Sequence, residues 1–404
     1  MSDDENTNTN LPLHVSTNLV HGGGMRSEFG ETSEALFLTS GYVYPDAETA
    51  QARMAGDIPG YVYSRYANPT VRMLEEKLAL LEGAETCRIT ASGMAAISAA
   101  LVAPCQQGDR IVAARALFGS CTWILNNLLP KFGVETEFVD GADLDAWKTA
   151  LSRPARLVLV ESPSNPLLEA VDIKAVCDLA HAAGAEVIVD NVFATPLLQK
   201  PFELGADWVV YSLTKHMDGQ GRVLAGAILG KKEAMEDTFD QYLRHTGPAV
   251  SPFNAWTVLK GLETLDIRVE RMTSTASVLA DFLAEHAAVR DVRYPGRHDH
   301  PQSDVHTKQM KNGGSLIAFS LNGGQPSAFK LLNALNVISI SNNLGDAKSL
   351  ICHPATTTHR TLSDEERAMV GLDDSWVRLS VGLEHPDDLK NDLDQALAQC
   401  MQSR

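Results

Sequence analysis

Between residues 68 and 261, short apolar runs alternate with amphipathic segments. Runs dominated by apolar residues, as expected for strands buried in a sheet, occur at 86–90, 156–161, 186–190, 208–212 and 223–229. The segments 71–83 and 173–183 carry apolar residues at helical spacing. Strands that alternate with helices need crossover connections. The pattern therefore predicts an α/β domain with a mainly parallel sheet, covered by helices on both faces.

The regions on either side of this pattern differ from it. Residues 1–65 show no sustained periodicity and are predicted to form an extended N-terminal arm. Residues 66–261 form the predicted large domain. After residue 261 the chain has a long helical stretch, three separate strand-like runs and a final helix, which predict a smaller α+β domain over 262–404.

Composition narrows the classes of partner. The formal net charge of the 404 residues is −17, which argues against a nucleic-acid binder because phosphate binding needs clustered Lys and Arg. The six cysteines form no C-x-x-C pair, so neither a zinc site nor a disulfide framework is indicated. We find no signal peptide and no membrane-spanning run, and we expect a cytoplasmic protein that acts on small molecules.

Polar residues follow four of the predicted strands, where ligands of open α/β sheets bind. Gly93 and Met94 begin a helix whose N–H groups could hold a phosphate, although a plain turn is the alternative. Asn165 lies between two prolines that could hold its amide toward a ligand, although an ordinary turn is the alternative. Asp190 is a carboxylate at a buried strand end, or else a helix cap. Lys215 lies between two apolar runs, where a desolvated amine can form an imine.

Taken together, these residues suit one cofactor. Pyridoxal 5′-phosphate (PLP) needs a phosphate cradle, a lysine that forms an imine with its aldehyde, and a carboxylate that pairs with its pyridinium nitrogen. No single junction is specific, but the combination predicts a PLP enzyme.

The chain also resembles the Cys/Met-metabolism family of PLP enzymes, the trans-sulfuration or cystathionine γ-synthase-like group. The resemblance rests on the ordered strings Tyr63-Ser-Arg65-Tyr-Ala-Asn-Pro-Thr70, Ala91-Ser-Gly-Met94, Glu161-Ser-Pro-Ser-Asn-Pro166, Val189-Asp190-Asn191, Ser212-Leu-Thr-Lys215, Leu344-Gly-Asp346, His353-Pro354 and Val377-Arg-Leu-Ser-Val-Gly-Leu-Glu384. It implies the aspartate-aminotransferase-like fold type I, with a seven-stranded sheet in the large domain. It also implies a homotetramer, a dimer of dimers whose active sites are shared between subunits.

The resemblance assigns a role to each site residue. Lys215 would be the catalytic lysine that carries PLP, and Arg378 would bind the substrate α-carboxylate together with Asn165 and Asn343. Contacts to the cofactor would come from Gly93, Met94, Phe118, Asp190, Ser212 and Thr214, and from Tyr63 and Arg65 of a neighbouring subunit. No metal is implied.

Two departures from the family pattern bear on the reaction. Phe118 stands where many relatives have a tyrosine, and Asn343 stands where serine is frequent. The chain most resembles enzymes that replace the succinyl ester of O-succinylhomoserine with sulfide, giving homocysteine and succinate for methionine biosynthesis. The alternatives are a cystathionine γ-synthase, an O-acetylhomoserine sulfhydrylase, a γ-lyase, or a binding protein that has lost catalysis.

Several histidines remain. His298, His300 and His306 could be metal ligands, but we expect them in a solvated polar loop. His353 and His359 flank a turn that the family pattern places near the active site, where a structural role is the expectation.

Overall fold

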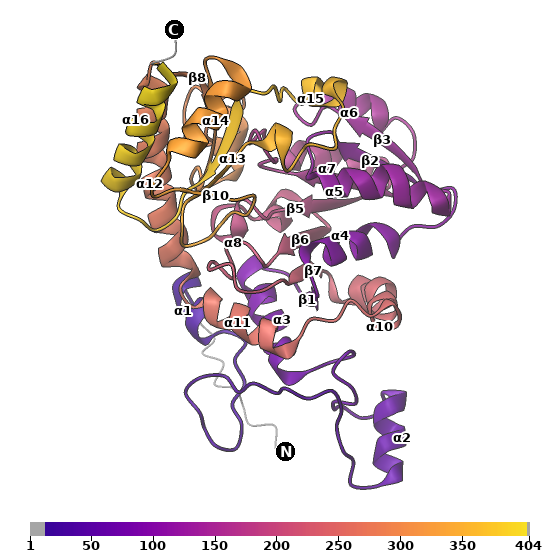
Figure 1. Ribbon diagram of the computed structural model, residues 1–404. Helices are drawn as coiled ribbons and strands as arrows, with labels where there is room; N and C mark the ends of the chain where they lie inside the picture. Colours follow the sequence, from indigo (N-terminus) through magenta and orange to yellow (C-terminus); the bar gives the residue numbers. More distant parts are fainter. Residues whose placement is uncertain (1–12, 402–404) are drawn as a thin grey trace.

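The computed structural model describes residues 13–401, and its centre is a seven-stranded sheet in the order β1-β7-β6-β5-β4-β2-β3 (Figure 1). The strands are β1 Thr86–Thr90, β2 Arg110–Ala114, β3 Glu135–Val139, β4 Leu157–Glu161, β5 Glu186–Asp190, β6 Trp208–Ser212 and β7 Gly226–Gly230. Strands β3, β2, β4, β5 and β6 are parallel, and β7 is antiparallel to both β6 and β1. The predicted mainly parallel sheet is confirmed.

Helices cover both faces of this sheet, because successive strand residues point to opposite sides. Leu157 and Leu159 of β4 enter one core and Val158 and Val160 enter the other. Helices α3, α7 and α11 pack in the second of these cores, and α4, α5 and η4 in the first. The helices of this part are α3 Pro69–Glu82, α4 Gly93–Val102, α5 Gly119–Trp123, α6 Leu144–Ala150, α7 Ile173–Ala182, α8 Thr195–Leu198, α9 Lys232–Ala234, α10 Gln241–Thr246 and α11 Pro252–Leu262, with η1 Ile124–Leu128, η2 Leu129–Phe132, η3 Pro201–Leu204 and η4 Met235–Asp240.

A second, five-stranded sheet in the order β10-β11-β12-β9-β8 forms the smaller C-terminal domain. Helices α12, α14 and α16 pack on one face of it, at the upper left of Figure 1. Its elements are α12 Leu265–Glu285, β8 Val289–Arg293, α13 Ser303–Gln309, β9 Leu316–Leu321, α14 Gly324–Ala334, β10 Ser339–Ile340, β11 Leu350–Cys352, η5 Pro354–Thr356, α15 Asp364–Met369, β12 Trp376–Ser380 and α16 Pro386–Met401.

Helix α12 belongs to both cores. Its first turns place Leu265 and Val269 in the core of the large domain, whereas Ala276 and Leu283 lie in the core of the small one. A single helix thus joins the two domains, and the exact boundaries at 65/66 and 261/262 stay predictions.

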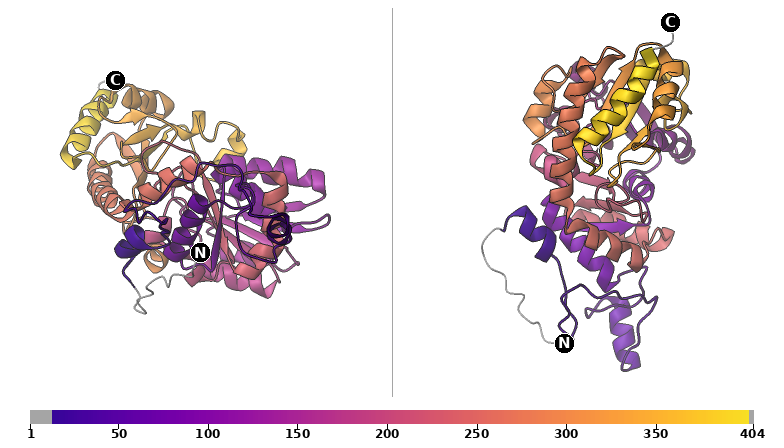
Figure 2. Two further views of the ribbon diagram at one scale, coloured as in Figure 1. Left: turned by 90° about the horizontal axis from the view of Figure 1, so that it is seen from below. Right: turned by 60° about the vertical axis from the view of Figure 1, so that its left-hand side comes forward.

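The N-terminal arm is more regular than expected. Its described part, residues 13–65, contains two helices, α1 Val15–His21 and α2 Ala47–Ala55, so the expectation of a segment without regular structure is wrong there. Asp46 caps α2 and Gly56 ends it at φ 83°, but none of its residues is buried, which is why no apolar periodicity announced it. The arm projects away from the sheet in two views (Figures 1 and 2).

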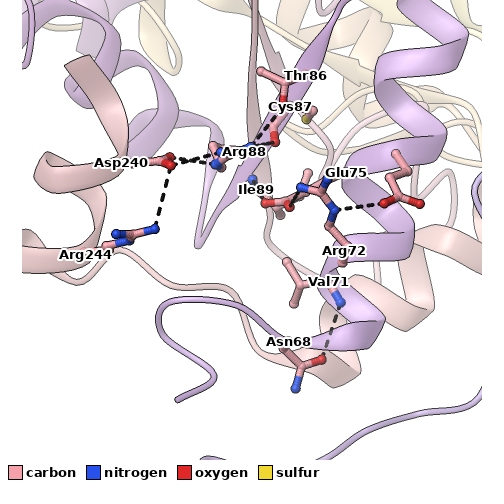
Figure 3. Close-up of polar contacts among 11 residues, drawn as sticks. Asn68, Val71, Arg72, Glu75, Thr86, Cys87, Arg88, Ile89, Asp240 and Arg244 are labelled. Atoms are coloured by element: carbon pink, nitrogen blue, oxygen red, sulfur yellow. Dashed lines mark hydrogen bonds and ion pairs between the residues drawn. The ribbon is translucent and has the colours of Figure 1, made fainter. Parts of the chain in front are cut away.

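Ion pairs fix the region where the arm enters the large domain (Figure 3). The Arg88 guanidinium contacts Asp240 at 2.7 and 3.0 Å and thereby joins β1 to η4. The Glu75 carboxylate accepts the Ile89 N–H at 3.2 Å, and Asn68 caps α3.

Within residues 13–401, no helix is both long and apolar enough to cross a membrane.

Candidate active site

A cavity of about 270 Å³ lies at the carboxyl edge of the large sheet, between the two domains. Nine of the residues singled out from the sequence line it, although they come from distant parts of the chain: Gly93, Met94, Phe118, Asn165, Asp190, Ser212, Thr214, Lys215 and Arg378. The parallel strands β4, β5 and β6 contribute Glu161, Asp190 and Ser212 at their carboxyl ends, as open α/β sheets do at a ligand site.

The start of helix α4 forms one end of the cavity. Ser92 is its N-cap and accepts the Ala95 N–H at 3.1 Å. The Gly93 and Met94 N–H groups before it have no acceptor within residues 13–401 and lie at the positive end of the helix. A Cβ on Gly93 would lie 2.6 Å from Cβ of Ser212. Only glycine therefore allows α4 to approach the end of β6 so closely. This end of the cavity suits a phosphate dianion.

Lys215 follows β6 and reaches into the cavity. Its Nζ donates to Oδ1 of Asn343 at 2.6 Å. Burial, together with the nearby positive charge of Arg378, lowers the pKa of Lys215 to about 8. The neutral amine, which is the nucleophilic form, is therefore readily populated near neutral pH.

The turn after Lys215 is held from the small-domain side. The Arg268 guanidinium on α12 donates to the His216 carbonyl at 2.7 Å, and His216 Nε2 lies 2.8 Å from Oγ of Ser315. His216 is buried but does not line the cavity, so it holds the lysine turn rather than facing a ligand.

Two carboxylates meet at the ends of neighbouring strands, since Glu161 of β4 is in register with Asp190 of β5. Burial raises the pKa of both, and the Asp190 charge raises that of Glu161 further. The Asp190 carboxylate accepts the Val192 N–H at 3.1 Å, the one hydrogen bond that this carboxylate forms among the described residues. A carboxylate so placed suits a cationic partner in the cavity.

The Glu161 carboxylate binds backbone N–H groups of the cavity wall, a role that the sequence did not suggest. One carboxylate oxygen accepts the Phe118 N–H at 2.8 Å, and the other accepts the Asn165 N–H at 2.9 Å. It therefore fixes two lining loops at once. A glutamate directly after a buried strand was the one available signal, but its two partners are backbone groups that a sequence does not pair.

Arg378 of β12 supplies the positive charge opposite the carboxylates. Its guanidinium is 2% exposed, and it donates to Asn165 Oδ1 at 2.7 Å and to the Asn342 carbonyl at 2.9 Å. Its Nε has no partner, and no carboxylate within residues 13–401 forms an ion pair with it. A buried guanidinium without a counter-ion is a natural site for a ligand carboxylate.

Tyr63 and Arg65 do not reach this cavity. Both are exposed; the Arg65 guanidinium lies 5.4 Å from the centre of the Tyr63 ring and donates to the Arg244 carbonyl. Neither residue lines the cavity of its own chain. That they complete the site of a neighbouring subunit stays a prediction.

The expectation for the histidine loop is wrong. His300 and His306 are 3% and 2% exposed, and their rings meet edge to face with centroids 4.7 Å apart. His306 Nε2 lies 3.2 Å from the Leu168 carbonyl, so the loop folds back onto the large domain instead of facing solvent. No metal-binding group of three His, Cys, Asp or Glu occurs in the described part of the chain.

Comparison with known proteins agrees with this geometry. A family model described as "Cys/Met metabolism PLP-dependent enzyme" matches residues 16–398. The chain belongs to this family. It is therefore a PLP-dependent enzyme of sulfur amino-acid metabolism.

Among its relatives, O-succinylhomoserine sulfhydrylase of Mycobacterium tuberculosis is 56% identical over 383 residues, which are 94% of each chain. L-methionine gamma-lyase of Treponema denticola is 40% identical over 95% of this chain and 97% of that protein. The structure of cystathionine gamma synthase from Xanthomonas oryzae pv. oryzae matches with a TM-score of 0.93 at 33% identity, over 98% of this chain and all of that one. The expected fold type I, with its large and smaller domains, is confirmed.

The residues of the cavity fit PLP. The free N–H groups at the start of α4 suit its phosphate, Asp190 suits its pyridinium nitrogen, and the Lys215 amine suits its aldehyde. The assignment of each residue to its role is part of the proposal that follows.

Proposed function

We propose that the protein replaces the succinyl ester of O-succinylhomoserine with sulfide, giving homocysteine and succinate. The observation that carries the proposal is the 56% identity to O-succinylhomoserine sulfhydrylase over 94% of both chains. Phe118 in the cavity wall supports it on chemical grounds.

In this proposal the chain's own residues orient the substrate and move protons. Bound PLP supplies an electron sink conjugated to the substrate Cα. Arg378, aligned by Asn165, holds the α-carboxylate, and Asp190 holds the proton on the ring nitrogen. Lys215 removes the Cα proton and returns protons when the new bond has formed; the Asn343 amide oxygen accepts from Nζ and orients it.

Phe118 bears on the leaving group. Its ring can stack on the cofactor, but it has no phenol to give a proton. A succinate carboxylate leaves readily without protonation, whereas a thiolate benefits more from an acid. The cavity wall therefore favours an acyl ester over the thioether substrates of a γ-lyase.

Product analysis tests the proposal. Mass identification of products from O-succinylhomoserine with sulfide, with cysteine and with neither separates a sulfhydrylase from a cystathionine γ-synthase and a γ-lyase. We expect homocysteine to be the main product when both nucleophiles are offered. Cystathionine as the main product, or oxobutyrate formed equally fast in the presence of sulfide, would overturn the assignment.

Phe118→Tyr gives a sharper test of the leaving-group argument. The variant should keep most sulfhydrylase activity and gain γ-elimination of cystathionine or methionine. One positioned acid is typically worth about 10²–10⁴-fold, and a hydroxyl without a supporting hydrogen bond should give less. Because the measurement is the ratio of two substrates within one variant, a general loss of stability largely cancels. If the ratio of γ-elimination to sulfhydrylase activity were the same in Phe118→Tyr as in the wild type, the leaving-group argument would be contradicted.

We also propose that the enzyme is a homotetramer, a dimer of dimers in which Tyr63 and Arg65 complete the phosphate site of a neighbour. The exposure of both residues, and their position outside their own cavity, support this arrangement.

Mixing two inactive variants tests the shared site. Arg65→Ala and Lys215→Ala, unfolded and refolded together, should regain activity because some sites in a hybrid combine an intact Arg65 with an intact Lys215. Each variant refolded alone is the control. Full activity of a monomer would contradict the shared site.

A further inference from the structure

A second cavity of about 330 Å³ lies beside the first, and we call it the side chamber. It is lined by Arg115, Ala116, Leu117, Thr122, Asn126, Phe138, Asn165, His359, Leu362, Glu366, Met369 and Val370. Asn165 lines both cavities. The wall between the two cavities is thin, because the adjacent residues Leu117 and Phe118 line different cavities: Leu117 lines the side chamber and Phe118 lines the active site.

The chamber lies on the same edge of the sheet as the active site. Arg115 directly follows β2, and β2 pairs with β4, at whose end Glu161 stands. Phe138 belongs to β3, the next strand outward. The carboxyl edge of the sheet therefore continues from the active site into the chamber.

Arg115 brings a positive charge into the chamber. Its guanidinium forms no ion pair with any carboxylate of residues 13–401. Glu169 is near enough for the Arg115 charge to act on it, but burial raises the pKa of Glu169 to about 7. Glu366 also lines the chamber, with one carboxylate oxygen accepting the Ser363 N–H at 2.7 Å in the capping box of α15.

Two further polar side chains, His359 and Asn165, line the chamber. His359 is 1% exposed, and its Nδ1 lies 2.8 Å from Oγ1 of Thr358. Its Nε2 is buried and forms no hydrogen bond of ordinary geometry within residues 13–401, but the Asn165 backbone is near enough to act on the ring as a hydrogen-bond acceptor. When Nδ1 accepts the Thr358 hydroxyl proton, Nε2 carries a hydrogen and can donate. The Asn165 side-chain nitrogen likewise donates no hydrogen bond within the described residues. The Asn165 side-chain nitrogen is thus a donor that a ligand in the chamber can use.

The two cavities are linked through hydrogen bonds. Thr358 lines the active site, while its hydroxyl contacts His359 of the side chamber. The Asn165 side-chain oxygen accepts from Arg378, which faces the substrate α-carboxylate in the proposed function. The Asn165 side-chain nitrogen donates no hydrogen bond within residues 13–401. A ligand in one cavity is thus in contact with residues that line the other.

We propose that the side chamber binds the terminal carboxylate of a dicarboxylic acyl group on the activated homoserine, with Arg115 as the residue that selects a succinyl ester over an acetyl ester. The inference rests on the proposed function. The α-carboxylate occupies Arg378, so the carboxylate at the far end of the acyl group needs a separate cationic site. Arg115 is a guanidinium without an ion pair in the wall adjoining Asn165. An acetyl ester carries no such carboxylate, so Arg115 adds nothing to its binding.

The test compares two esters in the same holoenzyme. The ratio of kcat/KM for O-succinylhomoserine to that for O-acetylhomoserine, with sulfide, is measured for the wild type and Arg115→Gln. Hydrogen bonds to a charged group are worth enough that the ratio should fall about 10- to 100-fold. Arg115→Lys keeps the charge without the planar fork and should lose part of the preference. Arg360→Gln is the matched control, because Arg360 is exposed on the same loop as His359 and does not line the chamber.

A binding measurement tests the side chamber independently of turnover. Calorimetric titration of the holoenzyme with succinate should give clear binding, which weakens in Arg115→Gln; acetate should bind no better to the wild type than to the variant. The inference would be overturned if Arg115→Gln lowered kcat/KM equally for both esters, or if it left the affinity for succinate unchanged. Either result would leave the sulfhydrylase assignment intact. If neither ester yields homocysteine in the wild type, the proposed function fails, and the succinate titration alone then decides whether the chamber binds dicarboxylates.

Discussion

Replacing Lys215 with alanine is expected to abolish turnover and the visible absorbance of the bound cofactor. Among the lining residues of the active-site cavity, Lys215 provides the sole primary amine, so no other lysine can take over the link to the PLP aldehyde. Its depressed pKa, about 8, means that the amine is already reactive without a separate base. Loss of the nucleophile and of the group that moves the Cα proton should remove activity beyond detection.

The measurement is an absorbance spectrum together with an activity assay on the purified variant. Lys174→Ala serves as the control, because Lys174 lies on the surface of α7 in an ion pair with Asp178. Its spectrum and rate should match those of the wild type. A visible band of wild-type shape and height in Lys215→Ala would show that another residue carries the cofactor.

The parts of the fold that could be predicted are those with one dominant signal. Leu157 to Val160 are apolar without interruption because β4 is buried on both faces, and such a run has few other interpretations. Lys215 and Asp190 could be found because a charge next to a buried strand is costly unless it serves a ligand or a partner.

Other parts have signals that are too weak or not local. Helix α2 buries none of its residues, so its capping residues were the sole local clue. His300 and His306 lie in a polar stretch whose burial depends on contacts with the distant Leu168 carbonyl. Glu161 and the side chamber depend on which backbone groups and which loops meet in space, and the sequence spacing of Arg115, Asn165 and His359 gives no hint that they meet.

Asp190→Asn is expected to give a folded enzyme that binds PLP through Lys215 but is severely slowed. The amide has the shape of the carboxylate, so its oxygen can keep the hydrogen bond from the Val192 N–H. It cannot, however, stabilise a positive ring nitrogen, and the cofactor becomes a poorer electron sink. Loss of one electrostatic group aimed at developing charge typically costs roughly 10²–10³-fold in kcat, and we expect a fall of that order.

The charge of Asp190 also acts on its neighbour, which gives this prediction a second readout. Removing it lowers the pKa of Glu161, because one of the two causes that raise it is gone. The ionised form of Glu161, which accepts the Phe118 and Asn165 N–H groups, is then favoured more than in the wild type, so the melting temperature of the variant should not fall. Asp172→Asn is the matched control: Asp172 caps α7 outside the cavity, asparagine caps equally well, and its kcat should be unchanged. If Asp190→Asn kept a wild-type kcat with PLP bound, Asp190 would not be the partner of the ring nitrogen, and Glu161, the other carboxylate of the cavity, would have to take that place.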